Sequence, residues 1–372
     1  MGSKNIFDDV SKIGIGFMRL PPDWESTSVP YTEILDYAIN SGVNLFECAY
    51  FYNDGNCDDI VHKLLTPYSR DSYKLVNKMP LNGYLDNGYI PQRIFQTQLL
   101  RHNTTYFDFY LIQSINRWNI DTVKQTKLIE YLDFKKKCGH IKHLGFSFHD
   151  NEDTLLRVLD LYDWEFVMIQ LNWLDYFNGV AKGLVDILQS RGIPFNAMCV
   201  TKGGLLYDKK RLPSKVIRDT QYDMVDIDIS FVDALGTTVQ MHDLGDPLIL
   251  KHAIRKLILD KTHYGPFGIE SLDTLKTMAD DYRKHTLIPC TGCGYCEVGC
   301  PKNIKISQLF NDYNNIMSKD TIDYEQFDSF AQKGVKTGYY HRCIGCGNCS
   351  KKCPQGIDIG KELRSTLFNY RY

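Results

Sequence analysis

Two cysteine runs near the end of the chain constrain its structure more than any other feature of the sequence. The first run contains Cys290, Cys293, Cys296 and Cys300, and the second contains Cys343, Cys346, Cys349 and Cys353. Both have the spacing C-x2-C-x2-C-x3-C followed by proline. This spacing is typical of proteins with two [4Fe–4S] clusters, in which the fourth cysteine of each run ligates the cluster of the other run.

The cysteine pattern therefore predicts two [4Fe–4S] clusters with a crossed set of ligands. We expect one cluster to be held by Cys290, Cys293, Cys296 and Cys353, and the other by Cys343, Cys346, Cys349 and Cys300. Zinc is the competing interpretation, but zinc sites usually take two C-x2-C pairs and four ligands in all. Residues 301–342 separate the runs and include a helix-like stretch at Ile306–Ile316. A separation of this length favours a helical dicluster ferredoxin module over a compact two-stranded one.

The composition excludes several classes of protein. The chain has 372 residues, of which 43% are hydrophobic and 24% charged, and its formal net charge is -2. These values are typical of globular domains and give no electrostatic basis for binding nucleic acid. No apolar run reaches the roughly 18 residues of a membrane span, and residues 1–10 do not resemble a signal peptide. We therefore expect a cytoplasmic protein with no nucleic acid or membrane partner.

Cysteines in a long chain of this kind indicate metal or redox chemistry rather than a disulfide framework. Four cysteines lie outside the two runs, namely Cys48, Cys57, Cys138 and Cys199. We expect these four to be packing residues, because a free cysteine behaves as a small hydrophobic side chain.

The first 285 residues alternate short apolar segments with amphipathic ones. Strands are predicted at Ile13–Phe17, Val43–Phe46, Tyr73–Val76, Phe107–Ile112, His143–Phe146, Phe166–Ile169, Phe195–Met198 and Gly265–Gly268. Helices are predicted at Tyr31–Asn40, Asp58–Leu65, Arg93–Arg101, Asp121–Lys137, Asp153–Leu161, Ala181–Arg191, Pro247–Leu257 and Leu272–Lys284. This alternation over roughly 250 residues is typical of an α/β protein with a (β/α)8 TIM barrel. An open doubly wound sheet is the alternative, although no G-x-G-x-x-G motif follows the first strand.

We predict a barrel domain over residues 1–285 and a helical ferredoxin-like domain over residues 286–372. Segment Tyr207–Asp246 is the least regular and is predicted to form an elaborated loop over the barrel mouth. The chemistry of a TIM barrel takes place at the C-terminal ends of its strands. Glu47, Lys78 and Gln113 stand at the ends of the second, third and fourth strands, and Tyr52 follows Glu47 in its loop.

At these residues the chain resembles the aldo/keto reductase superfamily, and in particular its members with a C-terminal iron–sulfur domain. Gly42–Gly55 resembles the family signature that carries a catalytic aspartate and tyrosine. Ile13–Pro21 resembles the opening hairpin and first strand, and Phe107–Ser114 resembles the strand that ends in the family's histidine. Gly145–His149 and Phe267–Asp273 match further landmarks, so the resemblance covers nearly the whole chain.

The resemblance implies a catalytic site made of Tyr52, Lys78, Glu47 and Gln113, where the family has tyrosine, lysine, aspartate and histidine. Lys78 would favour the phenolate of Tyr52 and so lower a pKa that is ordinarily near ~10. Tyr52 would then exchange a proton with a carbonyl or hydroxyl oxygen. Glu47 would hold Lys78 charged, and Gln113 would donate a hydrogen bond to the substrate.

The resemblance also implies NADP or NAD as a cofactor of the barrel. Its contacts would be Ser147, Gln170, Gly268 and Ser271. Met168 stands where the family's carboxamide-binding glutamine is expected, and Gln170 follows two residues later. For His149 we favour a place in the ligand pocket over a capped turn.

These features predict an iron–sulfur oxidoreductase that acts on a small carbonyl or hydroxyl compound, with a ferredoxin or flavodoxin as its electron partner. Two alternatives stay open, because a nicotinamide transfers two electrons as hydride and a [4Fe–4S] cluster takes one. The clusters could feed single electrons to a reductase that uses no nicotinamide. The barrel could also be the binding platform of a non-catalytic electron-transfer or redox-sensing protein.

Overall fold

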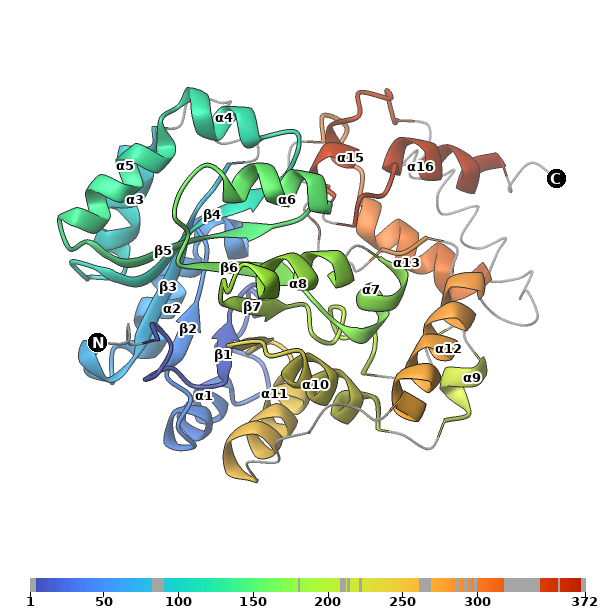
Figure 1. Cartoon of the computed structure of the whole chain (residues 1–372), viewed down its shortest axis with the longest axis horizontal. Helices are drawn as coiled ribbons and strands as arrows, with labels where there is room; N and C mark the ends of the chain where they lie inside the picture. The colour runs from blue at the N-terminus through green and yellow to red at the C-terminus, as the bar shows by residue number, and fades with distance from the viewer. Residues whose placement is uncertain are drawn as a thin grey trace. The chain divides into compact units, whose positions relative to one another are not determined.

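Eight parallel strands form a closed barrel in the computed structural model (Figure 1). The strands are β1 (Ile13–Gly16), β2 (Leu45–Glu47), β3 (Lys74–Met79), β4 (Phe107–Ile115), β5 (Ile141–Phe148), β6 (Phe166–Gln170), β7 (Phe195–Met198) and β8 (Gln240–Asp243). Each strand pairs with its neighbours in chain order, and β8 pairs with β1. The TIM barrel prediction is therefore confirmed, and the open sheet is excluded.

The structure describes most of the chain with several gaps. The described residues are 5–81, 90–179, 181–207, 212, 215–220, 223–260, 269–285, 288–290, 294, 296–297, 300–317, 342–353 and 355–368. The chain divides into two compact units, one of Met1–Tyr207 with Tyr222–Leu272 and one of Asp208–Gln221 with Asp273–Tyr372. Among the described helices, none combines the length and hydropathy that a membrane span requires.

Helices connect the strands and surround the barrel (Figure 1). Those of the barrel unit are α1 (Tyr31–Asn40), α2 (Cys57–Leu65), α3 (Pro91–Arg101), α4 (Ile120–Gln125), α5 (Leu128–Lys137), α6 (Glu152–Leu159), α7 (Trp173–Asn178), α8 (Ala181–Ser190), α10 (Met224–Ala234) and α11 (Pro247–Ile254). Local chemistry sets several of their ends. Pro91 opens α3, where its fixed φ suits the first turn. The Asn151 side chain caps α6 by accepting a hydrogen bond of 3.1 Å from the backbone of Thr154.

The single helix predicted at Asp121–Lys137 is in fact the two helices α4 and α5. Lys127 lies between them in the left-handed region, with a φ of 51°. A residue in that conformation cannot continue a right-handed helix, and the sequence offers no glycine there to signal the break.

The prediction of the eighth strand is wrong. Gly265–Gly268 lies outside the described residues, and the strand that closes the barrel is β8 at Gln240–Asp243. The segment predicted to be an irregular loop, Tyr207–Asp246, therefore contains both α10 and β8. The reason is that β8 is short and carries buried polar side chains, so it has no continuous apolar run to mark it as a strand.

Apolar side chains fill the barrel below its mouth. They come from alternate positions of the strands, as the period of two requires, and include Leu45, Val76, Phe109, Leu111, Phe166, Met168 and Met241. Phe7, from the segment before β1, stacks on Phe109 with ring centroids 5.0 Å apart. The packing leaves no room at Gly14, where a Cβ would lie 2.5 Å from the sulfur of Met241.

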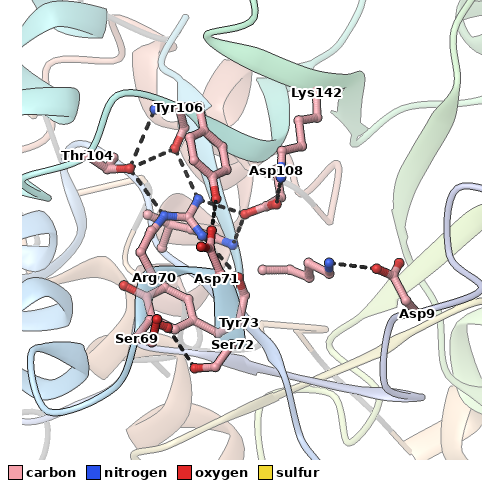
Figure 2. Close-up of polar contacts among 12 residues, drawn as sticks. Asp9, Ser69, Arg70, Asp71, Ser72, Tyr73, Thr104, Tyr106, Asp108 and Lys142 are labelled. Carbon is pink, nitrogen blue, oxygen red and sulfur yellow. Dashed lines mark hydrogen bonds and ion pairs between the residues drawn. The ribbon is translucent and has the colours of Figure 1, made fainter.

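A network of ion pairs and hydrogen bonds joins β3, β4 and β5 near their N-terminal ends (Figure 2). The Asp108 carboxylate is buried and accepts hydrogen bonds from Arg70 Nη2 at 2.7 Å and Lys142 Nζ at 2.9 Å. It also accepts one from the backbone N–H of Leu75 at 3.0 Å. The Tyr106 ring lies 4.1 Å from the Arg70 guanidinium and 4.2 Å from the Lys142 ammonium, an arrangement that adds cation–π attraction.

The second unit is built from helices around a small apolar core. Its elements are α9 (Lys215–Arg218), most of α12 (Ile269–His285), α13 (Ile306–Met317), α15 (Asn348–Lys352) and α16 (Ile359–Phe368). The core contains Ile288, Ile304, Ile306, Leu309, Phe310, Tyr313, Ile357, Ile359 and Leu363. The helix predicted at Ile306–Ile316 is confirmed as α13.

Candidate active site and cluster-binding segment

Polar side chains form a ring at the mouth of the barrel, directly above the layer of apolar side chains that forms its core. In β2, β3 and β4 the residues two positions after the core residues Leu45, Val76 and Leu111 are Glu47, Lys78 and Gln113. In β6 and β8 the corresponding residues are Gln170 and Asp243. Because alternate residues of a strand share one face, these side chains point into the same end of the barrel. This end is the C-terminal one, where TIM barrels place their chemistry.

Lys78 lies between Glu47 and Tyr52, so the structure brings together three of the four predicted catalytic residues. The Lys78 ammonium donates a hydrogen bond to the Tyr52 hydroxyl at 3.0 Å and another to the Glu47 carboxylate. All three side chains are buried. Tyr52 opens the short 3-10 segment η1 (Tyr52–Gly55), in which Asn53 and Asp54 adopt left-handed conformations. This tight turn directs the phenol back towards Lys78.

Burial and nearby negative charge have opposing effects on the pKa of Lys78. Burial lowers the pKa of Lys78 to about 7, while negative charge at Cys199 and Asp243 acts in the opposite direction. The Glu47 carboxylate, in direct contact with the ammonium, also favours the charged form. Lys78 is therefore a group that titrates near neutral pH, and the nearby carboxylates oppose the loss of its proton.

Asp243 is a site residue that the sequence analysis missed, because β8 was not recognised as a strand. A Cβ at Gly16 would lie 3.6 Å from Asp243 Oδ2 and 3.9 Å from Glu47 Oε2, so the two carboxylates flank this glycine. The backbone N–H groups of Arg19 and Gly245 donate to Asp243 at 3.0 Å and 2.8 Å. Burial nevertheless raises the pKa of Asp243 to about 7. In the sequence, the only indication of this site residue was that the segment Gln240–Asp243 ends in polar side chains.

Gln113 and His149 carry polar atoms that are buried and have no hydrogen-bond partner among the described residues. In Gln113 both amide atoms are in this state, and in His149 it is Nδ1. The backbone of His149 donates to Ile115 at 3.2 Å, which fixes this histidine beside the end of β4. Burial and the nearby charge of Lys78 lower the pKa of His149 to about 4, so its imidazole is neutral at pH 7. Unpaired buried polar atoms are rare in folded proteins, and at a barrel mouth they indicate a ligand.

Two of the four residues predicted to bind a nucleotide can be placed at the mouth. The Ser147 hydroxyl accepts a hydrogen bond of 2.8 Å from the backbone of Ser114 and keeps its own proton to donate. Gln170 donates to Asp175 at 2.5 Å, and Asp175 is paired with the buried Lys202. Met168 belongs to the barrel core, which leaves Gln170 as the mouth residue of β6. Gly268 lies outside the described residues, and the side chain of Ser271, in α12, is not described.

The four isolated cysteines differ in their surroundings. Cys48 and Cys57 are fully buried, as expected of packing residues. The expectation is wrong for Cys138, which is exposed at the end of α5. Cys199 is half-buried in a left-handed conformation directly after β7, and its electrostatic interaction with Lys78 places it at the active-site end of the barrel.

Four cluster cysteines surround one hollow in the second unit. Cys343, Cys346 and Cys349 of the second run line it together with Cys300 of the first run. The remaining wall is mainly apolar and includes Ile304, Ile306 and Leu363. This donor set, three cysteines from one run and the fourth from the other, fits a [4Fe–4S] cluster with crossed ligands.

The other predicted set is described only in part. Cys290 and Cys353 pack against the core of the second unit, and Cys296 belongs to that core. Cys293 lies outside the described residues. The left-handed conformations of Gly294, Gly345 and Gly347 show why the runs contain glycine, since residues with a Cβ rarely adopt them.

Comparison with known families assigns each part of the chain. Residues 12–246, well over half of the chain, match the profile described as the aldo/keto reductase family. Residues 289–363, which include both cysteine runs, match the profile described as a 4Fe-4S dicluster domain. The second match supports iron–sulfur clusters in this segment.

Solved structures agree with the barrel assignment. An aldo-keto reductase from Bacillus halodurans in its holo form is 17% identical, with a TM-score of 0.58, and the match covers 72% of this chain and 92% of that one. An aldo-keto reductase from Klebsiella pneumoniae in complex with NADPH is 16% identical, with a TM-score of 0.55 and coverages of 73% and 91%. At these identities the likeness concerns the fold.

Proposed function

Since the chain belongs to the aldo/keto reductase family, we propose that it is an iron–sulfur oxidoreductase that interconverts a small carbonyl compound and its alcohol at the barrel mouth. The observation that carries this proposal is the hydrogen bond of 3.0 Å between the Lys78 ammonium and the Tyr52 hydroxyl. A buried phenol needs such a neighbour to exchange a proton at neutral pH.

In this proposal Tyr52 gives its proton to the substrate oxygen during reduction, and takes it back during oxidation. Lys78 stabilises the phenolate that remains after the transfer, because its ammonium already contacts the phenol oxygen. Glu47 orients Lys78 and balances its charge. The longer glutamate side chain still reaches the lysine directly, so the replacement of the family's aspartate does not by itself break the arrangement.

Gln113 and His149 are proposed to hold the substrate oxygen. The unpaired amide of Gln113 can donate a hydrogen bond but cannot transfer a proton. His149, whose backbone is bonded to Ile115 at the end of β4, has a neutral imidazole and offers a second polar contact. Together they supply hydrogen bonds where the family places one histidine.

A nicotinamide nucleotide supplies a hydride when it is bound. For NADP or NAD, the described residues offer the Ser147 hydroxyl and the Gln170 amide at the mouth. The cluster segment would add one-electron transfer, with Cys300, Cys343, Cys346 and Cys349 as ligands of one cluster and Cys290, Cys293, Cys296 and Cys353 as ligands of a second. A ferredoxin or flavodoxin is the proposed partner for these electrons.

A second candidate is a reductase that receives single electrons through the clusters and binds no nicotinamide. The observation in its favour is that Gln170 donates its amide proton to Asp175, which is itself held by Lys202. Burial would raise the pKa of Asp175, but the Lys202 contact holds it below its ordinary value. The residue expected to hold the carboxamide is thus part of an internal ion-paired network.

The experiment that separates these candidates is an anaerobic titration of the cluster-loaded protein with NADPH and with NADH. Nucleotide binding and the visible absorbance of the clusters are followed together. Binding of either nucleotide supports the first candidate, and bleaching of the clusters would in addition connect the barrel to the second unit. If neither nucleotide binds while dithionite bleaches the clusters, the first candidate is wrong and the second is supported.

A further inference from the structure

A cluster of metal-ligating side chains lies on the other side of the barrel wall from the active site. Cys48 directly follows Glu47, and successive residues of a strand point to opposite faces. Glu47 therefore points into the mouth, and Cys48 points outwards to the helices, where it meets Asp58 of α2 and His102 at the end of α3. Cys48 and Asp58 are fully buried, and His102 is 5% exposed.

The three ligand atoms converge on one point. Cys48 Sγ lies 3.3 Å from Asp58 Oδ1 and 3.2 Å from His102 Nε2, and His102 Nε2 lies 3.0 Å from Asp58 Oδ1. Zinc binds sulfur at ~2.3 Å and nitrogen or oxygen at ~2.0–2.1 Å, so tetrahedral ligands lie roughly 3.3–3.6 Å apart. A movement of a few tenths of an ångström would admit the ion.

Hydrogen bonding alone explains this geometry poorly. Asp58 Oδ1 faces three groups, namely Cys48 Sγ, His102 Nε2 and the Asn77 amide at 2.8 Å. Asp58 Oδ2 is buried and has no partner among the described residues. His102 Nε2 has both the sulfur and the oxygen within reach, although one ring nitrogen can direct only one proton or lone pair.

Charge and a fourth donor complete the site. A divalent cation with one thiolate, one carboxylate and one neutral imidazole has no net charge, which suits a layer closed to water. The thiol of Cys57, the residue before Asp58, is also fully buried, but the ligand atoms that converge are those of Cys48, Asp58 and His102. The second oxygen of Asp58, which is buried and has no partner among the described residues, can fill the fourth position without changing this charge.

We propose that Cys48, Asp58 and His102 bind a structural zinc ion, with Asp58 Oδ2 as the fourth donor. The mixture of sulfur, nitrogen and oxygen ligands at tetrahedral spacing is typical of zinc. The ion fastens the end of β2 to α2 and α3. Glu47 directly precedes Cys48 in the chain. The zinc site therefore also fixes the end of β2, from which the Glu47 side chain reaches Lys78.

The test measures zinc and iron separately in the full-length protein, purified anaerobically with its clusters. We expect about one zinc per chain, retained on dialysis, with X-ray absorption at the zinc edge showing a single sulfur ligand and the rest nitrogen or oxygen. His102→Ala and Cys48→Ala should each lose most of the zinc while keeping the cluster iron. Cys138→Ala, which changes an exposed cysteine, should keep both metals.

Three results would overturn the proposal. The first is wild-type protein with iron in its clusters and no zinc. The second is zinc bound by four sulfurs, which would place it in a cluster site. The third is zinc that persists in both variants. If the variants do not fold, the metal content and absorption spectrum of the wild type still decide the question.

Discussion

Asp108, near the N-terminal end of the barrel, and Gln113 with His149, at the C-terminal end, differ in how their buried polar atoms are satisfied. At the N-terminal end, both carboxylate oxygens of Asp108 accept hydrogen bonds from Arg70, Lys142 and Leu75. At the C-terminal end, Gln113 and His149 keep buried polar atoms that no described residue satisfies. The paired carboxylate of Asp108 holds β3, β4 and β5 together, whereas the unpaired atoms of Gln113 and His149 are available to a ligand. The difference indicates that one end supports the fold and the other performs the chemistry.

The largest expected effect belongs to Tyr52. Tyr52→Phe removes the proton that Lys78 activates but keeps the ring, so turnover should fall by about 10³-fold. The thermal unfolding temperature should change little. Steady-state rates on a panel of small aldehydes and ketones, with the electron source identified by the anaerobic titration, measure the loss. Tyr50→Phe in the same loop is the control, and equal rates for Tyr52→Phe and the wild type would contradict the proposed mechanism.

At the opposite end, Asp108→Ala should reduce the free energy of unfolding by about 2–3 kcal/mol. The change leaves the Leu75 N–H without its acceptor and removes the charge partner of the Arg70 guanidinium, which keeps its contacts with Tyr73, Thr104 and Tyr106. The half-exposed Lys142 contributes little. Chemical denaturation measures the effect, and the turnover of the folded protein should be unchanged. Asp71→Asn, at an exposed contact with Tyr106, is the matched control. A variant as stable as the wild type would show that the network is dispensable.

The pH dependence tests the charge of Lys78. Because its pKa is lowered to about 7, the charged lysine is lost as pH rises through 7, and the rate should fall about tenfold per unit above it. Lys78→Arg keeps the charge and should remove this alkaline limb from whatever activity the variant retains. Asp243→Asn removes a negative charge that favours the ammonium, so it should move the limb to lower pH. A flat profile up to pH 9 in the wild type would mean that Lys78 does not titrate there.

The smallest expected effect is that of a substitution at Gln113, which should change stability and substrate binding in different directions. Gln113→Met removes two unpaired buried polar atoms, so it should increase stability by about 1 kcal/mol. The same change removes a proposed contact with the substrate and should raise KM about tenfold. Unfolding curves and Michaelis constants are measured on the same preparations. A loss of stability would show that Gln113 has a structural partner, and an unchanged KM would remove it from the substrate site.

Much of this structure could be read from the sequence. The cysteine spacing predicted the iron–sulfur segment, and the alternation of strands and helices predicted the barrel, because both depend on local periodicity. The period of two within a strand also explains how Glu47 and Lys78 come to face the mouth. The local sequence pattern gave wrong predictions in two places. No glycine marks the helix break at Lys127, and buried polar residues interrupt the apolar pattern of the strand β8.

What the sequence by itself determined is therefore the kind of fold, the iron–sulfur segment and the identity of Tyr52 and Lys78 as site candidates. Only the tertiary structure placed Asp243 beside Glu47 and left Gln113 unpaired. It also brought Cys48, Asp58 and His102 within 3.3 Å of one another. The physical reason is that these contacts join strands and helices far apart in the chain. Their electrostatics depend on burial and distance, which arise only when the barrel closes.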